Sequence, residues 1–253
     1  MKYIINTLLI VTVLFLGLYV VAKQRNDIMD ISQKVIDEAI KKHGGNKLYE
    51  KAHYAYDFRD KHYVAKRQKS DFTYTRQYID KTGDKIMDVM TNETFVRKTN
   101  DQVTALDDKK IINYRNSINS VNYFAFLPYA LNDEAVHKKY LGYADIDDIP
   151  YHKIQVTFDQ EGGGDDYDDI YVYWIRDEDF TLDYLAYSYE VNGGGVRFRK
   201  AYNPREVGGI RFQDYINYKY FNKDFPVDQL DEKLMAGELE ELSRIELKNI
   251  EKR

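Results

Sequence analysis

Short segments that alternate apolar and polar residues recur along most of this chain, and they limit its fold more than any other feature. HYAYDFR (53–59), HYVAKRQ (62–68) and FTYTRQYI (72–79) follow one another with turn residues between them. A period of two residues is typical of strands with one buried face. No helical stretch separates the segments, so they predict a meander of antiparallel strands rather than βαβ units.

A second series of strand-like segments occupies the C-terminal half. These are HKIQVTF (152–158), DIYVYWIR (169–176), YLAYSYEV (184–191), GVRFRKAY (195–202) and GIRFQDYINYKYF (209–221). In DIYVYWIR, Tyr171, Tyr173 and Ile175 should share one face, with Val172 and Trp174 on the other. The chain has 24 tyrosines, and tyrosine suits a pleated, half-buried surface with its polar tip toward water or a ligand.

An N-terminal helix is predicted at residues 27–42, DIMDISQKVIDEAIKK, because its apolar residues fall on one helical stripe. Asp27 is a suitable N-cap. Gly44 and Gly45 can end the helix in a left-handed turn.

Two further segments have helical spacing. Residues 107–142 carry it with a break at Pro128, and their last part, residues 135–142, should add a turn or two. Residues 227–253 are charged and have a partial apolar stripe that predicts a C-terminal helix. The fold class is therefore α+β and mostly β: a curved antiparallel sheet, or half-barrel, with an N-terminal helix, a helical insert and a C-terminal helix.

Residues 1–22 contain a hydrophobic run, YIINTLLIVTVLFLGLYVVA, that is long enough to cross a bilayer as a helix. It indicates either an uncleaved membrane anchor or a signal peptide cleaved near Ala22. We therefore expect the remainder of the chain to lie in the cell envelope, on the periplasmic side of the membrane. Residues 23–226 should form one tyrosine-rich β domain with its insert at 107–142, since that length is typical of a single domain.

Composition excludes several classes of protein. There is no cysteine, hence no disulfide, no thiolate metal site and no lipid-modified N-terminal cysteine. The net charge is −5, and no basic face suggests nucleic-acid binding. No HExxH, GxSxG, GxGxxG or GxxxxGK[ST] motif occurs, so no cofactor is predicted.

The acidic loop, residues 161–169 (EGGGDDYDD), is the sharpest local feature. Its carboxylates, on Asp165, Asp166, Asp168 and Asp169, are calcium-type ligands beside permissive glycines. The spacing is not that of an EF-hand, and acidic runs are usually solvated turns. We favour the solvated turn and retain calcium as the alternative.

Arg197 and Arg199 lie two residues apart on a predicted strand and so share a face, and Arg211 could join them from a neighbouring strand. Guanidinium groups suit a carboxylate, a phosphate or a lipid head group. Cross-strand pairing with acidic residues is the alternative. Aromatic residues near these arginines could line a ligand pocket; these are Tyr123, Phe124, Phe126, Tyr187 and Tyr189.

Four segments together resemble a family of uncharacterised bacterial envelope proteins. They are KKHGG, SVNYFAFLPYALNDEAV, VTFDQEGGGDDYDDIYVYW and LAYSYEVNGGGVRFRKAYNPREVGGIRF. Members usually carry an export signal, often a lipoprotein one, and this chain differs by lacking the cysteine. The order of elements is also similar to the outer-membrane lipoprotein carrier fold, in which a long helix precedes a curved antiparallel sheet.

Three functions fit these features. The first is an envelope binding or carrier module for an apolar or amphipathic ligand such as a lipid or lipoprotein. The second is an envelope hydrolase that uses carboxylates brought together only by folding. The third is a structural interaction domain held at the membrane.

Overall fold

The computed structural model describes residues 31–161, 167–190 and 193–253. The hydrophobic segment and the first residues of the predicted N-terminal helix lie outside these ranges. Residues 31–42 are helical, and Gly44 and Gly45 follow with positive φ, as expected. A side chain at Gly44 would collide with the Gly209 carbonyl and the Tyr129 hydroxyl, so glycine is required where the helix end meets the sheet. No helix within the described residues is long and apolar enough to span a bilayer.

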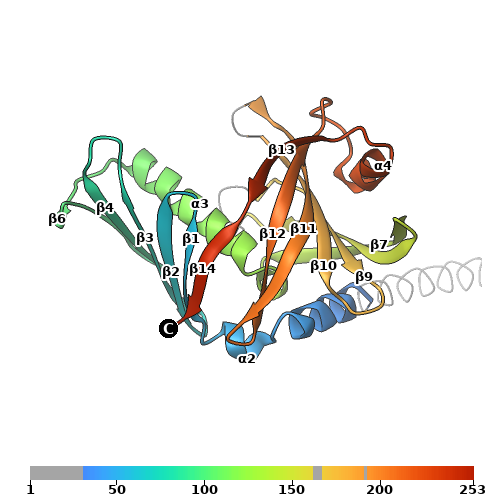
Figure 1. The fold of residues 1–253 in the computed structure, drawn as a ribbon, viewed down its shortest axis with the longest axis horizontal. Coiled ribbons are helices and arrows are strands. Elements are labelled where there is room, and N and C mark those ends of the chain that lie inside the picture. Colours follow the sequence, from blue (N-terminus) through green and yellow to red (C-terminus); the bar gives the residue numbers. More distant parts are fainter. Residues whose placement is uncertain (1–30, 162–166, 191–192) are drawn as a thin grey trace, which may run out of the picture.

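Two antiparallel sheets of seven strands each make up about half of the described chain (Figure 1). The first sheet has the order β14 (Leu247–Lys252), β1 (His53–Phe58), β2 (Lys61–Gln68), β3 (Asp71–Ile79), β4 (Lys85–Thr91), β5 (Phe95–Thr99) and β6 (Gln102–Val103). The second has the order β13 (Glu240–Ile245), β12 (Ile210–Lys219), β11 (Gly195–Val207), β10 (Leu182–Tyr189), β9 (Tyr171–Arg176), β8 (Ile149–Phe158) and β7 (Val136–Ile146). The predicted meanders are confirmed, since most neighbours are consecutive in sequence.

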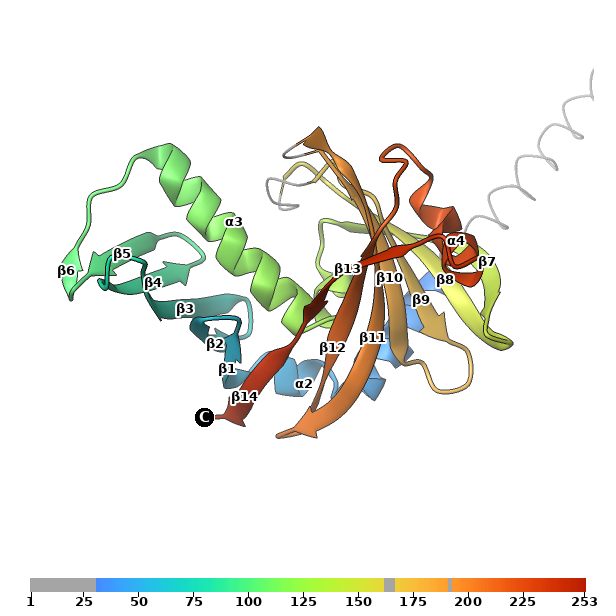
Figure 2. The same cartoon turned by 45° about the horizontal axis from the view of Figure 1, so that its top comes forward.

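The C-terminal segment joins the two sheets. Strand β13 lies at the edge of the second sheet, and β14 begins at the edge of the first after Glu246 alone. Figures 1 and 2 show this red segment running from one sheet to the other. The segment therefore makes one open, curved β structure out of two sheets.

The predicted helix over 227–253 is present only at its start. A 3-10 turn (η3, Val227–Gln229) and α4 (Leu230–Met235) are helical, and strands β13 and β14 follow. Gly237, with a φ of 68°, stands where the helix stops. The strand edges of β12 and β1 then offer a full row of backbone partners, and this pairing outweighs the weak helical stripe.

The insert begins as predicted with α3 (Asp108–Ala125), whose N-cap Asp107 accepts a hydrogen bond from the Lys110 backbone N–H. A 3-10 turn, η1 (Tyr129–Asn132), comes after Pro128. The stretch expected to be helical at 135–142 is instead the start of strand β7, which pairs with β8 along its length. That stretch is too short for periodicity to separate helix from strand.

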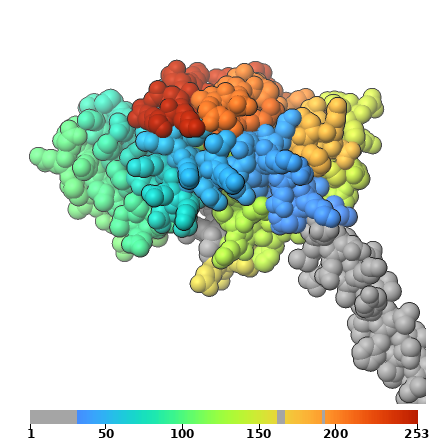
Figure 3. All heavy atoms as spheres, turned by 90° about the horizontal axis from the view of Figure 1, so that it is seen from below, coloured from blue at the N-terminus to red at the C-terminus, as the bar shows by residue number. Residues whose placement is uncertain are grey.

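The main core fills the space between the two sheets, the helix at residues 31–42 and the segment after α3. Phe126, Leu127, Tyr129 and Leu131 in this segment are almost fully buried. Figure 3 shows the N-terminal helix and the short α2 (Asn46–Tyr49), in blue, crossing one face of the molecule between the two sheets.

A smaller core lies on the opposite face of the second sheet, beneath α4. Trp174 is its largest member and is fully buried. The indole Nε1 of Trp174 and the Lys153 ammonium both donate to Asp231 of α4. The predicted alternation in β9 is confirmed, because Tyr173 lies in the main core while Trp174 lies in the smaller one.

Candidate functional site

A cavity of about 160 Å³ lies where the C-terminal half of α3, the second sheet and the β13–β14 connection meet. We call it the α3 cavity. Its wall combines apolar side chains with polar ones: Phe58, Arg59, Ser120, Val121, Phe124, Ala125, Arg199, Gln213, Tyr215, Asn217, Ser243, Ile245 and Leu247. Phe58 and Leu247 are also register partners across β1 and β14. The cavity therefore depends on the same connection that joins the sheets.

Arg199 of β11 is the only cation in this wall that is nearly fully buried, with 7% of its surface exposed. Its guanidinium carbon lies 3.7 Å from the centre of the Phe124 ring and 5.2 Å from that of Tyr187. Its Nη2 donates to the Tyr187 hydroxyl at 2.9 Å, while its Nε has no hydrogen-bond partner among the described residues. No carboxylate in the described ranges forms an ion pair with it. A buried cation held only by rings and a hydroxyl is short of negative charge.

Two amides accompany Arg199 on the neighbouring strand. Asn217 of β12 is the register partner of Arg199, and Gln213 lies on the same face because strand residues alternate. The Gln213 Nε2 donates to the Leu182 carbonyl and to the Tyr215 hydroxyl, which fixes the orientation of the amide. The Gln213 Oε1 and the Asn217 Oδ1 accept no hydrogen bond from any residue that the structure describes. The wall thus offers one cationic donor and two carbonyl acceptors.

Tyr215 lies between these polar groups and the main core. Burial raises the pKa of its hydroxyl to about 12, although the hydrogen bond from Gln213 and the positive charge of Arg199 both act to lower it. The phenol therefore stays protonated at physiological pH. It can accept from Gln213, but it supplies no negative charge to Arg199.

Of the residues predicted to bind a ligand, Arg199 and Phe124 line the α3 cavity. Tyr187 is outside the cavity wall and accepts a hydrogen bond from Arg199. Tyr123 leaves α3 toward the second sheet, where its hydroxyl and that of Tyr173 are 2.6 Å apart. Phe126 is placed in the main core, away from the cavity wall.

The other predicted residues lie outside the cavity wall. Arg197 shares the face of Arg199 on β11, as expected, and lies over the Tyr189 ring at 4.7 Å. The Arg211 backbone N–H donates to the His43 carbonyl, which places Arg211 near the end of the N-terminal helix. The three arginines therefore do not form one cluster.

The acidic loop is described only in part. Asp165 and Asp166 lie outside the described residues, Asp168 is exposed and Asp169 is buried. Within the described parts of the chain, no group of His, Asp and Glu side chains could hold a metal ion. The solvated turn and its calcium alternative both remain predictions.

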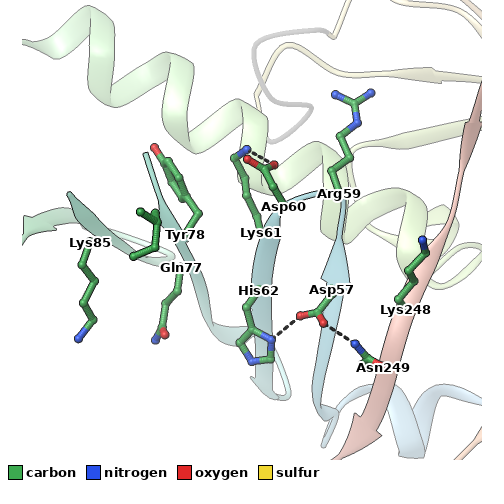
Figure 4. Close-up of a pocket in the computed structure, with 11 residues that line it drawn as sticks. Asp57, Arg59, Asp60, Lys61, His62, Gln77, Tyr78, Lys85, Lys248 and Asn249 are labelled. Atoms are coloured by element: carbon green, nitrogen blue, oxygen red, sulfur yellow. Dashed lines mark hydrogen bonds and ion pairs between the residues drawn. The ribbon is translucent and has the colours of Figure 1, made fainter. Parts of the chain in front are cut away.

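A second, larger groove of about 640 Å³ lies at the end of the first sheet where β1, β2, β3 and β14 meet (Figure 4). The Asp57 carboxylate accepts from Asn249 and is 2.7 Å from the His62 ring, and both contacts lower its pKa. The Lys61 ammonium, also in this groove, is paired with Asp60. The Asp57–Asn249 contact links β1 to β14, and most charged side chains of this groove, including Lys85 and Lys248, are paired within the protein, so the groove is a weaker candidate.

Sequence reasoning missed Gln213, Asn217 and Ser243. The signal was present in GIRFQDYINYKYF, where Arg211, Gln213, Tyr215 and Asn217 alternate onto one face. That face reads as solvated in an isolated strand, and only the position of α3 shows that it is buried.

The sequence from residue 8 to residue 247 matches the model of a family of unknown function, DUF6503. No curated protein matches the chain. A LolA superfamily protein from Nitrosomonas europaea aligns with a TM-score of 0.51 at 11% identity, over 88% of this chain and 93% of that one. This likeness confirms the lipoprotein-carrier-like layout, and the low identity limits it to the fold.

Two other solved structures are similar at lower scores. A DUF1329 family protein from Desulfovibrio piger has a TM-score of 0.47 at 8% identity, covering 87% of this chain and 92% of that one. A protein domain from Vibrio parahaemolyticus, named for outer-membrane lipoprotein sorting, has a TM-score of 0.41 at 6% identity, covering 81% and 99%.

Proposed function

The chain belongs to the family of unknown function DUF6503, and we propose that it is a cell-envelope binding or carrier module for an amphipathic ligand such as a lipid or lipoprotein. The observation that carries the proposal is the α3 cavity, which places apolar side chains beside a buried cation that pairs with no carboxylate among the described residues. Ligand sites commonly combine an apolar wall with a few convergent polar groups.

The fold and the predicted address support this proposal. An open, curved sheet partly covered by a helix has a concave side on which a ligand can be sheltered, as the likeness to a LolA superfamily protein indicates for the fold. Fold alone does not fix function, so the argument depends on the cavity. The hydrophobic segment in residues 1–22 would place the domain where lipids and lipoproteins travel.

The size of the cavity predicts how a ligand enters. Small-molecule sites are usually ~300–1,000 Å³, so about 160 Å³ holds only part of an acyl chain. A longer chain would require α3 to move away from the second sheet. Helix α3 packs Ile118 and Ala125 into the main core and makes polar contacts from Asn122 to Tyr56 and from Tyr123 to Tyr173. An outward movement of the helix would break these contacts but no strand pairing of either sheet.

The test is binding of a fluorescent fatty acid by the full chain. The chain is exported by the expression host and then purified in an amphipathic polymer, which takes the place of detergent. Val121→Trp should fill the cavity and abolish binding. The matched control is Ile112→Trp, because Ile112 is a half-exposed residue on the same helix outside the cavity wall. Binding that survives in Val121→Trp, or is absent from the wild type, would refute the proposal.

A further inference from the structure

The polar atoms of the α3 cavity indicate the chemistry of the polar group of the ligand. Three side chains in this wall, Arg199, Gln213 and Asn217, are each more than nine-tenths buried. Each also has one buried polar atom that lacks a hydrogen-bond partner in the part of the chain that the structure describes: Nε, Oε1 and Oδ1, respectively. Buried polar groups in folded proteins are almost always hydrogen-bonded. Three exceptions in one wall indicate a site built for a polar group that arrives from outside.

The donors and acceptors define the chemistry of that group. Arg199 has five N–H donors, and among the described residues one of them donates to Tyr187. Its positive charge calls for an anion, and its forked shape suits a carboxylate or a phosphate. The orphan oxygens on Gln213 and Asn217 call for the opposite partner, a hydrogen-bond donor.

We propose that the α3 cavity recognises an acidic amphiphile whose anionic head group also carries a hydrogen-bond donor, such as an α-hydroxyl or an amide N–H. The anion would pair with Arg199 while the donor reaches the carbonyl oxygen of Asn217, the register partner of Arg199. Arg199 and Asn217 face one another in register, so both interactions fall within one head group. The apolar part would lie against Val121 and Ile245. This inference rests on the proposed function and narrows it to one class of ligand.

The geometry also explains why Arg197 does not serve the same purpose. It lies on the same strand and face, but its guanidinium is over Tyr189 and donates to the Val196 carbonyl. It is absent from the cavity wall. Arg197 is therefore a matched control for Arg199.

The test compares four amphiphiles of one chain length, decanoate, α-hydroxydecanoate, decanol and decylamine, as competitors of the fluorescent fatty acid on the full chain. Decanoate should bind at least about tenfold more tightly than decanol or decylamine, since a charge-assisted hydrogen bond would be lost in both. α-Hydroxydecanoate should bind about three- to tenfold more tightly than decanoate, because its hydroxyl can donate one further hydrogen bond, to the Asn217 carbonyl oxygen. Arg199→Gln should remove the preference for decanoate over decanol, and Arg197→Gln should retain it.

The outcomes separate the two proposals. Equal binding of all four amphiphiles would overturn the head-group inference and leave the carrier proposal standing. No binding of any amphiphile would overturn both. Acetate or inorganic phosphate that competes as well as decanoate would identify a free small anion as the ligand and overturn the amphiphile class. If Arg199→Gln fails to fold, the wild-type ranking alone decides, and Arg199→Lys, which retains the charge but loses the fork, should lower affinity for decanoate without abolishing it.

Discussion

Phe126→Ala tests whether the segment after α3 is solid core. The Phe126 side chain is 2% exposed. Its ring lies 5.5 Å from the ring of Phe212, 5.7 Å from that of Tyr49, 6.1 Å from that of Tyr54 and 6.3 Å from that of Tyr56. Removing it would leave a cavity enclosed by four rigid rings, which collapse poorly. We expect a loss of ~3–5 kcal/mol in the free energy of unfolding.

The assay is thermal unfolding followed by circular dichroism. For a chain of this size, 1 kcal/mol changes Tm by ~2–4 °C, so the expected decrease is ~6–20 °C. The matched variant is Phe124→Ala, two residues earlier, whose half-buried ring borders the α3 cavity. It should cost only ~1–2 kcal/mol but weaken fatty-acid binding. A Tm decrease for Phe126→Ala no larger than that for Phe124→Ala would refute the assignment of Phe126 to the core.

Three further predictions concern charge and address. Burial lowers the pKa of His43 from 6.5 to about 3, with smaller contributions from nearby Arg211 and Lys42. The folded state therefore favours the neutral ring. The contribution of His43 to the free energy of unfolding is complete above pH 6.5, and it is lost by ~1.4 kcal/mol per pH unit as the pH falls from 6.5 toward 3. Urea unfolding at several pH values should show a shallower acid dependence in His43→Gln, and parallel curves would contradict this origin. Asp88→Asn should lower the free energy of unfolding by ~3–5 kcal/mol, because two buried arginines lose their counterion. Asp101→Asn, which removes an exposed ion pair, should lower it by less than ~1 kcal/mol. Urea denaturation measures both. Alkaline phosphatase fused after Arg253 should be active if the domain is exported. Activity of a cytoplasmic reporter fused at the same position instead would disprove the predicted localisation.

The sequence predicted the strands well because alternation reports directly on burial. In β9 the two faces of one segment enter two different cores, and both halves of the pattern, Tyr173 and Trp174, are buried. Prediction was wrong at 135–142 and after Gly237, where short or weak helical stripes competed with strand edges supplied by distant residues. Local spacing contains no information about those edges.

The candidate site could be predicted only in part for a similar reason. Arg199 and Phe124 could be proposed from residue type and predicted element alone, because one is an arginine on a strand and the other an aromatic residue in the helical insert. Asn217 becomes informative only through its register with Arg199, and Gln213 only through its contact with the Leu182 carbonyl. Both relationships join segments that are separated in sequence.

The β13–β14 connection also sets the order in which this protein can fold. Strand β1 receives its second neighbour from the last residues of the chain, where Tyr54 pairs with Lys252. Contacts of such high sequence separation form late and slow folding. Until they form, the edge of the first sheet stays open and the wall at Phe58 and Leu247 is incomplete. A polypeptide that emerges from a translocation channel N-terminus first would therefore remain unfinished until its final strand arrives. If the chain is exported in this direction, the β13–β14 connection completes the α3 cavity only after the last residues have crossed the membrane.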